Sequence, residues 1–420
     1  MSALALVAHR LGARVSGSDR AESGYIERLR ASGVKPSIGH DAEAVPEGAD
    51  VVVSSAIGDD NPELVRARER GQRILHRGEL LAELTAGRRS LIVAGTHGKT
   101  TTAGMLVHGL REIGADPSFV LGGELAGAGP GGEPANAGLG EGEWIVAESD
   151  ESDGSFLKLS PEVAIVTNVE LDHHSRWRSR AELLEAFAQF VAPAKGLALG
   201  AAEDLDALGA GGAEVVRFDA GEPGPQPLEL AVPGRHNLAN ARGAIAAVGL
   251  AGLDAEGFAA AMASFPGMLR RLERKGRHRS GAVVYDDYAH HPTEVSAGLA
   301  ALRELTPRRL VAVFQPHLYS RTKALAGGFG RALAAADLVG VLDVYPAREE
   351  PVGDLAAVSG LDVARTAADH SGGRRVMWLD DIETAARHLD AELREGDIAV
   401  TIGAGDVFRV ADALVGETEE

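Results

Sequence analysis

The spacing of hydrophobic positions at the start of the chain predicts a helix. Leu4, Val7, Ala8 and Leu11 recur at i, i+3, i+4 and i+7, which is the apolar stripe of an amphipathic helix. Residues 13–16, which follow, indicate a short strand. A helix followed by a strand is the second half of a βαβ unit, in which a strand and a glycine-rich turn come first.

Short apolar runs alternate with helical stretches along most of the chain. This alternation predicts parallel sheets covered by helices, so we expect an α/β fold. Each run is followed by a polar or glycine-bearing segment, and ligands bind at such strand ends in open α/β sheets. The predicted strands lie within 49–56, 89–96, 143–149, 162–168, 281–288, 308–315, 336–344 and 396–406.

Four segments interrupt this alternation. The stretch around Gly87 indicates the end of a first α/β unit, and the basic stretch 265–281 indicates a connector. Segments 123–138 and 219–227 are rich in Gly and Pro, which is typical of surface loops. With 420 residues, the chain has the length of two or three domains.

Composition narrows the class of protein. The formal net charge is -19, which disfavours nucleic acid and anionic membranes as partners because both need a positive surface. The sequence has no cysteine, so thiolate ligands and nucleophiles are excluded and a reducing compartment is favoured. No apolar run approaches the roughly 20 residues that span a bilayer. We therefore expect a cytoplasmic protein without membrane insertion.

The segment "VAGTHGKTTTAGMLVHGL" predicts a phosphate-binding loop between a strand and a helix. Gly95 and Gly98 allow backbone NH groups to close on phosphate oxygens, Lys99 can reach the β and γ phosphates, and the Thr100 hydroxyl can bind Mg²⁺. Val93 stands where the usual motif has its first glycine. The loop indicates a nucleotide but leaves open ATP or GTP, and kinase, GTPase or ligase chemistry.

Acidic and imidazole side chains follow the next two predicted strands. Glu148 and Asp150 come after the first of these strands, and Asn168, Asp172 and His173 come after the second. Carboxylate oxygens and imidazole at two strand ends beside a phosphate loop predict a second divalent cation.

Polar residues also open later helices. His236, Asn237 and Asn240 lie in the first turn of a predicted helix, where an Asn can cap the helix or bind an adenine edge. Two further strand ends precede helices, the first of which opens at Pro292. The two adjacent histidines at the first end could bind a metal, but substrate contact is favoured, and at the second end an Arg can clamp a carboxylate. These ends carry Asp286, Asp287, Tyr288, His290 and His291, then His317, Ser320, Arg321 and Thr322.

Taken together, these segments resemble the Mur ligases of peptidoglycan synthesis, and within that family the alanine-adding branch. The motifs, in chain order, are "AGTHGKTTT", "ESDESDGSF", "TNVELDH", "PGRHNLANA", "DDYAHHPTE", "FQPHLYSRT", "DVYPAREEP" and "GAGDV". The resemblance implies a UDP-sugar-binding Rossmann-like domain, a central P-loop ATPase-type α/β domain and a C-terminal Rossmann-like domain for the amino acid. These domains are expected at 1–87, 88–268 and 269–420.

The resemblance also implies a reaction. ATP would phosphorylate the carboxylate of UDP-N-acetylmuramate, and the amine of L-alanine would attack the acyl phosphate. ATP and Mg²⁺ are the implied cofactors, and a monomer or weak homodimer is expected. Two other functions stay open: a recycling ligase that attaches a whole tripeptide, and a nucleotide-binding protein that has lost its sugar site.

The roles of individual residues are carried over by position. Lys99, Glu148, His173 and Asn168 form the implied catalytic set, with Thr100, Glu148 and His173 as metal ligands. The implied ATP contacts are Gly95, Thr96, His97, Gly98, Lys99, Thr100, Thr101, His236, Asn237, Asn240, Arg271 and Asp287. The implied substrate contacts are Ser18, Asp19, Ser55 and Ala56 for the sugar nucleotide, and Tyr288, His290 and Arg321 for alanine. Many relatives have Arg where Leu318 stands.

Relatives also begin with a strand and a turn of the type G-x-G-G-x-G-M-S. Met1 and Ser2 match the last two residues of that turn. The first strand and the glycines are therefore expected to be missing from the sequence as given, and with them a cradle for the UDP pyrophosphate.

Overall fold

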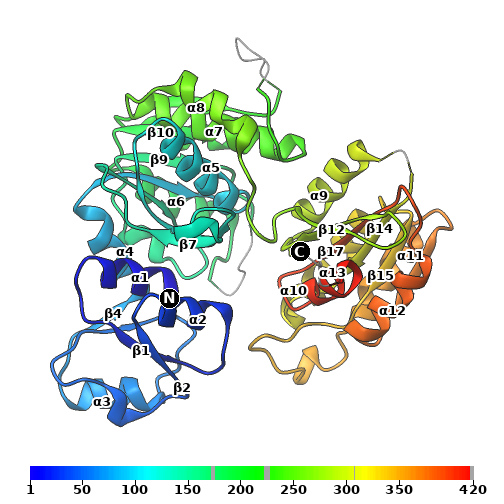
Figure 1. Cartoon of the computed structure of the whole chain (residues 1–420), viewed down its shortest axis with the longest axis horizontal. Coiled ribbons are helices and arrows are strands. Elements are labelled where there is room, and N and C mark those ends of the chain that lie inside the picture. The colour runs from blue at the N-terminus through cyan, green and yellow to red at the C-terminus, as the bar shows by residue number, and fades with distance from the viewer. Residues whose placement is uncertain (172–175, 222–227, 307, 417–420) are drawn as a thin grey trace. The chain divides into compact units, whose positions relative to one another are not determined.

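The computed structural model describes residues 1–171, 176–221, 228–306 and 308–416 (Figure 1). The chain forms two compact units. The first comprises Met1–Ala231 and Leu238–Pro266, and the second comprises Val232–Asn237 and Gly267–Glu420. Within the described ranges, no helix is both long and apolar enough to cross a membrane.

The start of the first unit contains two small parallel sheets, β1 with β2 and β3 with β4. The predicted first helix is confirmed, but the strand after it begins at Ser16 rather than at 13. Gly12 has a φ of 96°, and the Ala13 NH donates to the Ala8 carbonyl, so these residues close the helix instead. The elements are α1 (Ser2–Arg10), β1 (Ser16–Asp19), α2 (Gly24–Ala31), β2 (Lys35–Ile38), β3 (Val51–Val53), α3 (Pro62–Glu69), β4 (Ile74–His76) and α4 (Arg77–Ala86).

The rest of the first unit is built on a seven-stranded sheet of order β11-β10-β9-β5-β8-β6-β7. Its central strand, β5, is buried from its second residue to its last, as expected for a parallel strand covered on both faces. Phe187 and Phe190 of α6 pack on one face beside Ile92 and Val166. The elements are β5 (Arg89–Ala94), α5 (Lys99–Glu112), β6 (Ser118–Leu125), β7 (Ala135–Gly138), β8 (Trp144–Glu148), β9 (Val163–Val166), α6 (Arg180–Val191), β10 (Gly196–Gly200), β11 (Glu214–Phe218), α7 (Arg235–Leu250) and α8 (Ala255–Ala261).

The prediction that 123–138 is a surface loop was wrong at both ends, because residues 123–125 belong to β6 and residues 135–138 form β7. This strand runs antiparallel to β6, and its Ala137 packs against Leu4 and Val7 of α1. A Cβ at Gly138 would lie 2.2 Å from the Phe119 ring, so the small residues allow close packing. The Gly-rich composition here reflects tight contacts within a sheet rather than a free loop. Most of the second predicted loop, 222–227, lies outside the described residues.

The second unit has a six-stranded sheet of order β12-β13-β17-β14-β15-β16, parallel except for β12. Helices cover both faces: α9, α10 and α11 pack on one, and α12 and α13 on the other. The elements are β12 (Glu273–Arg277), β13 (Val283–Asp287), α9 (Pro292–Leu305), β14 (Leu310–Phe314), α10 (Tyr319–Leu333), β15 (Leu338–Val341), α11 (Gly360–His370), β16 (Arg375–Trp378), α12 (Ile382–Glu392), β17 (Ile398–Ile402) and α13 (Phe408–Val415).

The basic stretch 265–281 is not purely a connector, because β12 lies inside it. Its sequence, ERKGR, lacks apolar alternation, so periodicity could not find it. The strand occupies a sheet edge, where charged side chains are favoured since they discourage pairing with other chains.

Candidate active site

Two glycines shape the loop between β5 and α5. Gly98 has a φ of 81°, and a Cβ there would lie 2.4 Å from Asn240 Oδ1. Gly95 has a φ of 127°, and its Cβ would lie 2.1 Å from Thr167 Oγ1. Only glycine fits either position. No described side chain caps the N-terminus of α5, which keeps the positive end of its dipole available for an anion.

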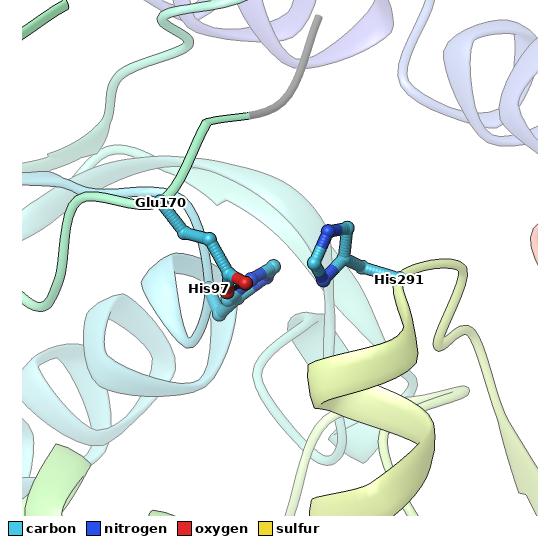
Figure 2. A group of neighbouring side chains, drawn as sticks. All are labelled: His97, Glu170 and His291. Atoms are coloured by element: carbon cyan, nitrogen blue, oxygen red, sulfur yellow. Dashed lines mark hydrogen bonds and ion pairs between the residues drawn. The ribbon is translucent and has the colours of Figure 1, made fainter. Parts of the chain in front are cut away.

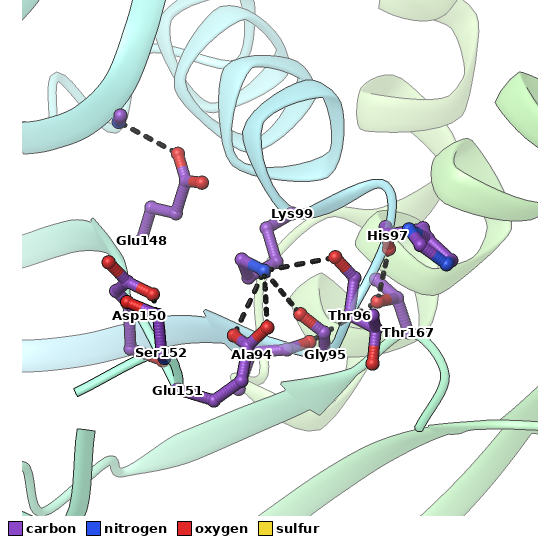
Figure 3. Close-up of polar contacts among 12 residues, drawn as sticks. Ala94, Gly95, Thr96, His97, Lys99, Glu148, Asp150, Glu151, Ser152 and Thr167 are labelled. Carbon is purple, nitrogen blue, oxygen red and sulfur yellow. Dashed lines mark hydrogen bonds and ion pairs between the residues drawn. The ribbon is translucent and has the colours of Figure 1, made fainter. Parts of the chain in front are cut away.

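The Lys99 ammonium lies at the base of this loop (Figure 3). Its Nζ donates to the carbonyl oxygens of Gly95 at 2.5 Å and Thr96 at 3.1 Å, and it lies 2.9 Å from Glu151 Oε2. Burial lowers the pKa of Lys99, but the neighbouring carboxylates, Glu151 first, outweigh it and the pKa is raised. A permanent positive charge is therefore held where a phosphate can meet it.

Thr100 and Glu148 bring two oxygen ligands together. Thr100 Oγ1 donates to Glu148 Oε1 at 2.8 Å, and the Gly122 NH donates to Glu148 Oε2 at 2.7 Å. A Cβ at Gly122 would lie 2.6 Å from that oxygen, so glycine leaves room for the carboxylate. Hydroxyl and carboxylate oxygens are the ligands that Mg²⁺ prefers. This donor set fits the expected cation.

Asn168 and Thr167 hold the loop backbone. The Asn168 side chain accepts from the His97 NH at 2.9 Å and donates to the His97 carbonyl at 3.0 Å. Thr167 Oγ1 donates to the same carbonyl at 2.6 Å. Asn168 thus lies beside the loop and fixes its shape. Thr101, which follows Thr100 in the first turn of α5, is buried.

Glu170 supports the loop from the same side. His97 Nε2 and Glu170 Oε2 are 2.8 Å apart (Figure 2), and Thr96 Oγ1 exchanges hydrogen bonds with the Glu170 backbone at 2.9 and 3.0 Å. Asp172 and His173 lie outside the described residues. Sequence reasoning missed Glu151, Thr167 and Glu170, although all three stand within the segments it selected.

Of the predicted sugar-nucleotide residues, Ser18 and Asp19 lie at the end of β1, and Ser55 and Ala56 follow β3. Ser18 Oγ donates to Glu63 Oε2 at 2.6 Å and lies 2.8 Å from His40 Nδ1. Ser55 Oγ donates to Asp153 Oδ2 at 2.8 Å. Asp19 and Ala56 are exposed beside these serines.

The predicted adenine contacts divide between the two units. Asn240 belongs to the first unit and lies beside Gly98 of the phosphate loop. His236 and Asn237 belong to the second, where Asn237 Nδ2 donates to the Pro233 carbonyl at 2.7 Å. Burial lowers the pKa of His236, which favours its neutral form.

Arg271 and Asp287 lie in the second unit. Burial raises the pKa of Asp287 to about 7, although the Arg271 guanidinium opposes this. The Arg271 guanidinium lies 5.1 Å from the centre of the Tyr288 ring, and that of Arg270 lies 5.0 Å from it. The structure therefore brings Asp287, Arg271 and Tyr288 together at the carboxyl end of β13.

Tyr288, His290 and Arg321 are linked through His317. Ring centroids are 5.6 Å apart for Tyr288 and His290, and 6.4 Å apart for His290 and His317. Arg321 Nη1 lies 3.4 Å from His317 Nδ1. Burial and the Arg321 charge lower the pKa of His317 to about 4, so a neutral imidazole accepts from the guanidinium.

Leu318, at the start of α10, has a φ of 71°. This is rare for a residue with a branched side chain and costs on the order of 1 kcal/mol or more. The strain lies beside His317 and one turn before Arg321, where the alanine contacts are expected.

The fold and this loop define a class of nucleotide-using α/β enzymes, and the chain belongs to the Mur ligase family. Three family models match it: the Mur ligase family catalytic domain at residues 1–89, the Mur ligase middle domain at 93–222, and the Mur ligase glutamate ligase domain at 270–405.

Individual relatives cover almost the whole chain. A UDP-N-acetylmuramate–L-alanine ligase from Kineococcus radiotolerans is 44% identical, covering 99% of this chain and 93% of the relative. One of the same name from Mycobacterium sp. (strain JLS) is 42% identical, covering 99% and 92%. The crystal structure of UDP-N-acetylmuramate-alanine ligase MurC from Thermotoga maritima has a TM-score of 0.82 at 27% identity, covering 98% of this chain and 94% of that one.

Proposed function

We propose that this chain joins L-alanine to the lactyl carboxylate of UDP-N-acetylmuramate at the expense of ATP, in the synthesis of peptidoglycan precursors. Relatives that carry this name align with 99% of the chain, at 42% and 44% sequence identity. The observation that carries the proposal is the loop itself, in which a buried, charged Lys99 is followed by Thr100, whose hydroxyl donates to Glu148.

The reaction has two steps. A carboxylate oxygen attacks the γ phosphorus of ATP, the bond to the β–γ bridging oxygen breaks, and ADP leaves. The amine nitrogen of L-alanine then attacks the acyl carbon, the phosphate leaves, and the nitrogen loses a proton. Lys99 and the NH groups of the loop stabilise the negative charge on the transferred phosphoryl group.

Thr100 and Glu148 would hold one Mg²⁺ and His173 a second. When bound, these cations would reduce the repulsion between the phosphates and the substrate carboxylate. Asn168 keeps the His97 backbone in place and so maintains the shape of the loop.

The remaining predicted residues fall into three groups. His236, Asn237, Asn240, Arg271 and Asp287 would contact the bound nucleotide. Tyr288, His290 and Arg321 would bind L-alanine, with Arg321 on its carboxylate. Ser18, Asp19, Ser55 and Ala56 would bind the sugar nucleotide. We also propose domains at 1–87, 88–268 and 269–420, a cytoplasmic location, and a monomer or weak homodimer.

A comparison of acceptors tests this function. The protein is mixed with ATP, Mg²⁺ and UDP-N-acetylmuramate, together with L-alanine, glycine, L-serine or a tripeptide, and the products are identified by mass. The proposal predicts an L-alanine adduct formed in equal amount to ADP. A product formed mainly from the tripeptide would identify a recycling ligase, and nucleotide binding without any adduct would indicate a binding protein.

A further inference from the structure

Arg77, the first residue of α4, joins two carboxylates in another part of the first unit. Its Nη2 donates to Asp150 Oδ2 and to Asp153 Oδ2, each at 2.8 Å, and its Nε lies 3.3 Å from Asp153 Oδ2. Sequence reasoning gave this residue no role. A guanidinium fork shared by two carboxylates is a geometrically specific contact.

The segment that Arg77 clamps, residues 150–155, is also stabilised by its own hydrogen bonds. The Asp150 carboxylate accepts from the Ser152 NH, and the Asp153 carboxylate accepts from the Ser155 NH, each at 2.9 Å. Because Asp153 accepts these hydrogen bonds, its pKa falls well below the usual range despite burial. The Arg77 guanidinium forms an ion pair with each of the two carboxylates and lies between them.

The same segment carries the residue that meets the catalytic lysine. Glu151 lies between the two clamped residues in sequence, its side chain is 3% exposed, and its Oε2 is 2.9 Å from Lys99 Nζ. The indole Nε1 of Trp177 donates to the Glu151 carbonyl at 2.9 Å. Glu148, the partner of Thr100, comes two residues before Asp150.

We propose that Arg77 is a positioning residue for the phosphate loop: by clamping Asp150 and Asp153 it fixes the segment that sets Glu148 against Thr100 and Glu151 against Lys99. Ser55, a proposed sugar-nucleotide contact, also donates to Asp153. The clamp thereby connects the sugar-nucleotide side of the first unit with the ATP side. The proposal rests on the proposed function only for the reaction that serves as a readout.

The direction of the effect follows from charge. Without Arg77, two carboxylates stay close together with no guanidinium between them, and their repulsion favours a shifted segment. A shift moves the Glu148 oxygens away from Thr100 and the Glu151 carboxylate away from Lys99. A lysine at position 77 supplies the charge but not the two-pronged geometry, so it should restore only part of the function.

The test compares Arg77→Ala and Arg77→Lys with Lys158→Ala. Lys158, the last residue of the 3₁₀ helix η3 (Ser155–Lys158), also pairs with α4, through an exposed ion pair with Glu79 at 3.0 Å that involves neither Asp150 nor Asp153. For Arg77→Ala, kcat should fall about 10- to 100-fold and the Mg²⁺ concentration for half-maximal rate should rise, as for the loss of a group that orients metal ligands. Any loss of UDP-N-acetylmuramate affinity, transmitted through Asp153 and Ser55, should be smaller than these effects, and Arg77→Lys should lie between.

Two results would overturn the proposal. One is a kcat and Mg²⁺ dependence of Arg77→Ala that equal those of Lys158→Ala. The other is a loss confined to UDP-N-acetylmuramate affinity, which would make Arg77 a substrate contact. If Arg77→Ala does not fold by circular dichroism, Asp153→Asn decides in the same assays. If the wild-type protein forms no product, the proposed function fails, whereas Mg²⁺-dependent binding of a non-hydrolysable ATP analogue still tests the clamp.

Discussion

Thr100 Oγ1 donates to Glu148 Oε1 across 2.8 Å, which ties the first turn of α5 to the end of β8. The two oxygens that we propose as Mg²⁺ ligands are therefore neighbours in the structure. We expect Glu148→Gln to raise the Mg²⁺ concentration for half-maximal activity and to lower the rate, because the neutral amide is a poorer ligand. Glu143→Gln, just before β8 on an exposed surface, is the control. If the Mg²⁺ titrations of the two variants coincide, Glu148 does not bind Mg²⁺ and its role is only structural.

Lys99→Met should strongly lower turnover. The change removes the ammonium that lies at the base of the phosphate loop, and the loss of one such charge-stabilising group costs about 10²- to 10³-fold in rate. Phosphate release measures the effect, with Lys195→Met, a largely exposed lysine, as the control. Release by Lys99→Met at the wild-type rate would refute the assignment of the loop.

Gly98→Ala should weaken nucleotide binding more than it lowers stability. Gly98 and Gly114 have φ values of 81° and 78°, so alanine is strained at both and costs about 1 kcal/mol. Only at Gly98 would the Cβ also collide, with Asn240, because no heavy atom lies within 4 Å at Gly114. Thermal melts should shift for both variants, whereas calorimetry with an ATP analogue should show weaker binding for Gly98→Ala alone. Equal binding by the two variants contradicts the geometry of the loop.

Asp287→Asn should change how stability depends on pH. Burial raises the pKa of Asp287 to about 7 from an ordinary value near 4, so the folded state holds a proton that the unfolded state loses. The contribution of this bound proton to the free energy of unfolding is fully present below about pH 4 and is lost as pH rises through about 7. The stability of the asparagine variant relative to wild type should therefore grow by about 2 to 3 kcal/mol between pH 5 and pH 8.

Denaturant unfolding at several pH values checks this, with the exposed Asp380→Asn as the control. Parallel pH curves for wild type and Asp287→Asn would mean that Asp287 does not titrate in this range.

Arg321→Ala should raise the KM for L-alanine and leave the KM for ATP unchanged. The guanidinium is proposed to bind the amino-acid carboxylate, and charge-assisted hydrogen bonds contribute about 1.5 to 3 kcal/mol each. Arg321→Lys should keep the charge but lose the bidentate geometry, so its KM should be intermediate. An equal rise in both KM values would place Arg321 outside the alanine site.

The sequence predicts the fold where periodicity and turn chemistry agree. The eight predicted strand segments all contain strands, including β5 and β17, because buried parallel strands are continuous apolar runs. Among the described residues, the strands that lie in no predicted segment are β2, β4, β6, β7, β10, β11, β12 and β16. For β12 and β7 the reason is that an edge strand of charged residues and a strand of Ala, Asn and Gly lack that signal. Pairing with β13 and β6 defines them, and pairing is a tertiary property.

The candidate site shows the same division. The phosphate loop was predictable because glycine conformation, lysine charge and the helix N-terminus act locally. The contact of Glu151 with Lys99, and of Arg77 with Asp153, joins residues 52 and 76 positions apart, and spacing gives no information about such pairs. The same holds for Asn168, whose hydrogen bonds show that it braces the loop at His97.

The most direct test of the central claim uses UDP-N-acetylmuramate labelled with ¹⁸O in its lactyl carboxylate. The labelled substrate is incubated with the protein, ATP, Mg²⁺ and L-alanine, and the mass of the released phosphate is measured. An acyl phosphate intermediate transfers one labelled oxygen to phosphate for each amide bond formed, and this is the result we predict. Phosphate that carries no label, or label in phosphate without an L-alanine adduct, would contradict the account.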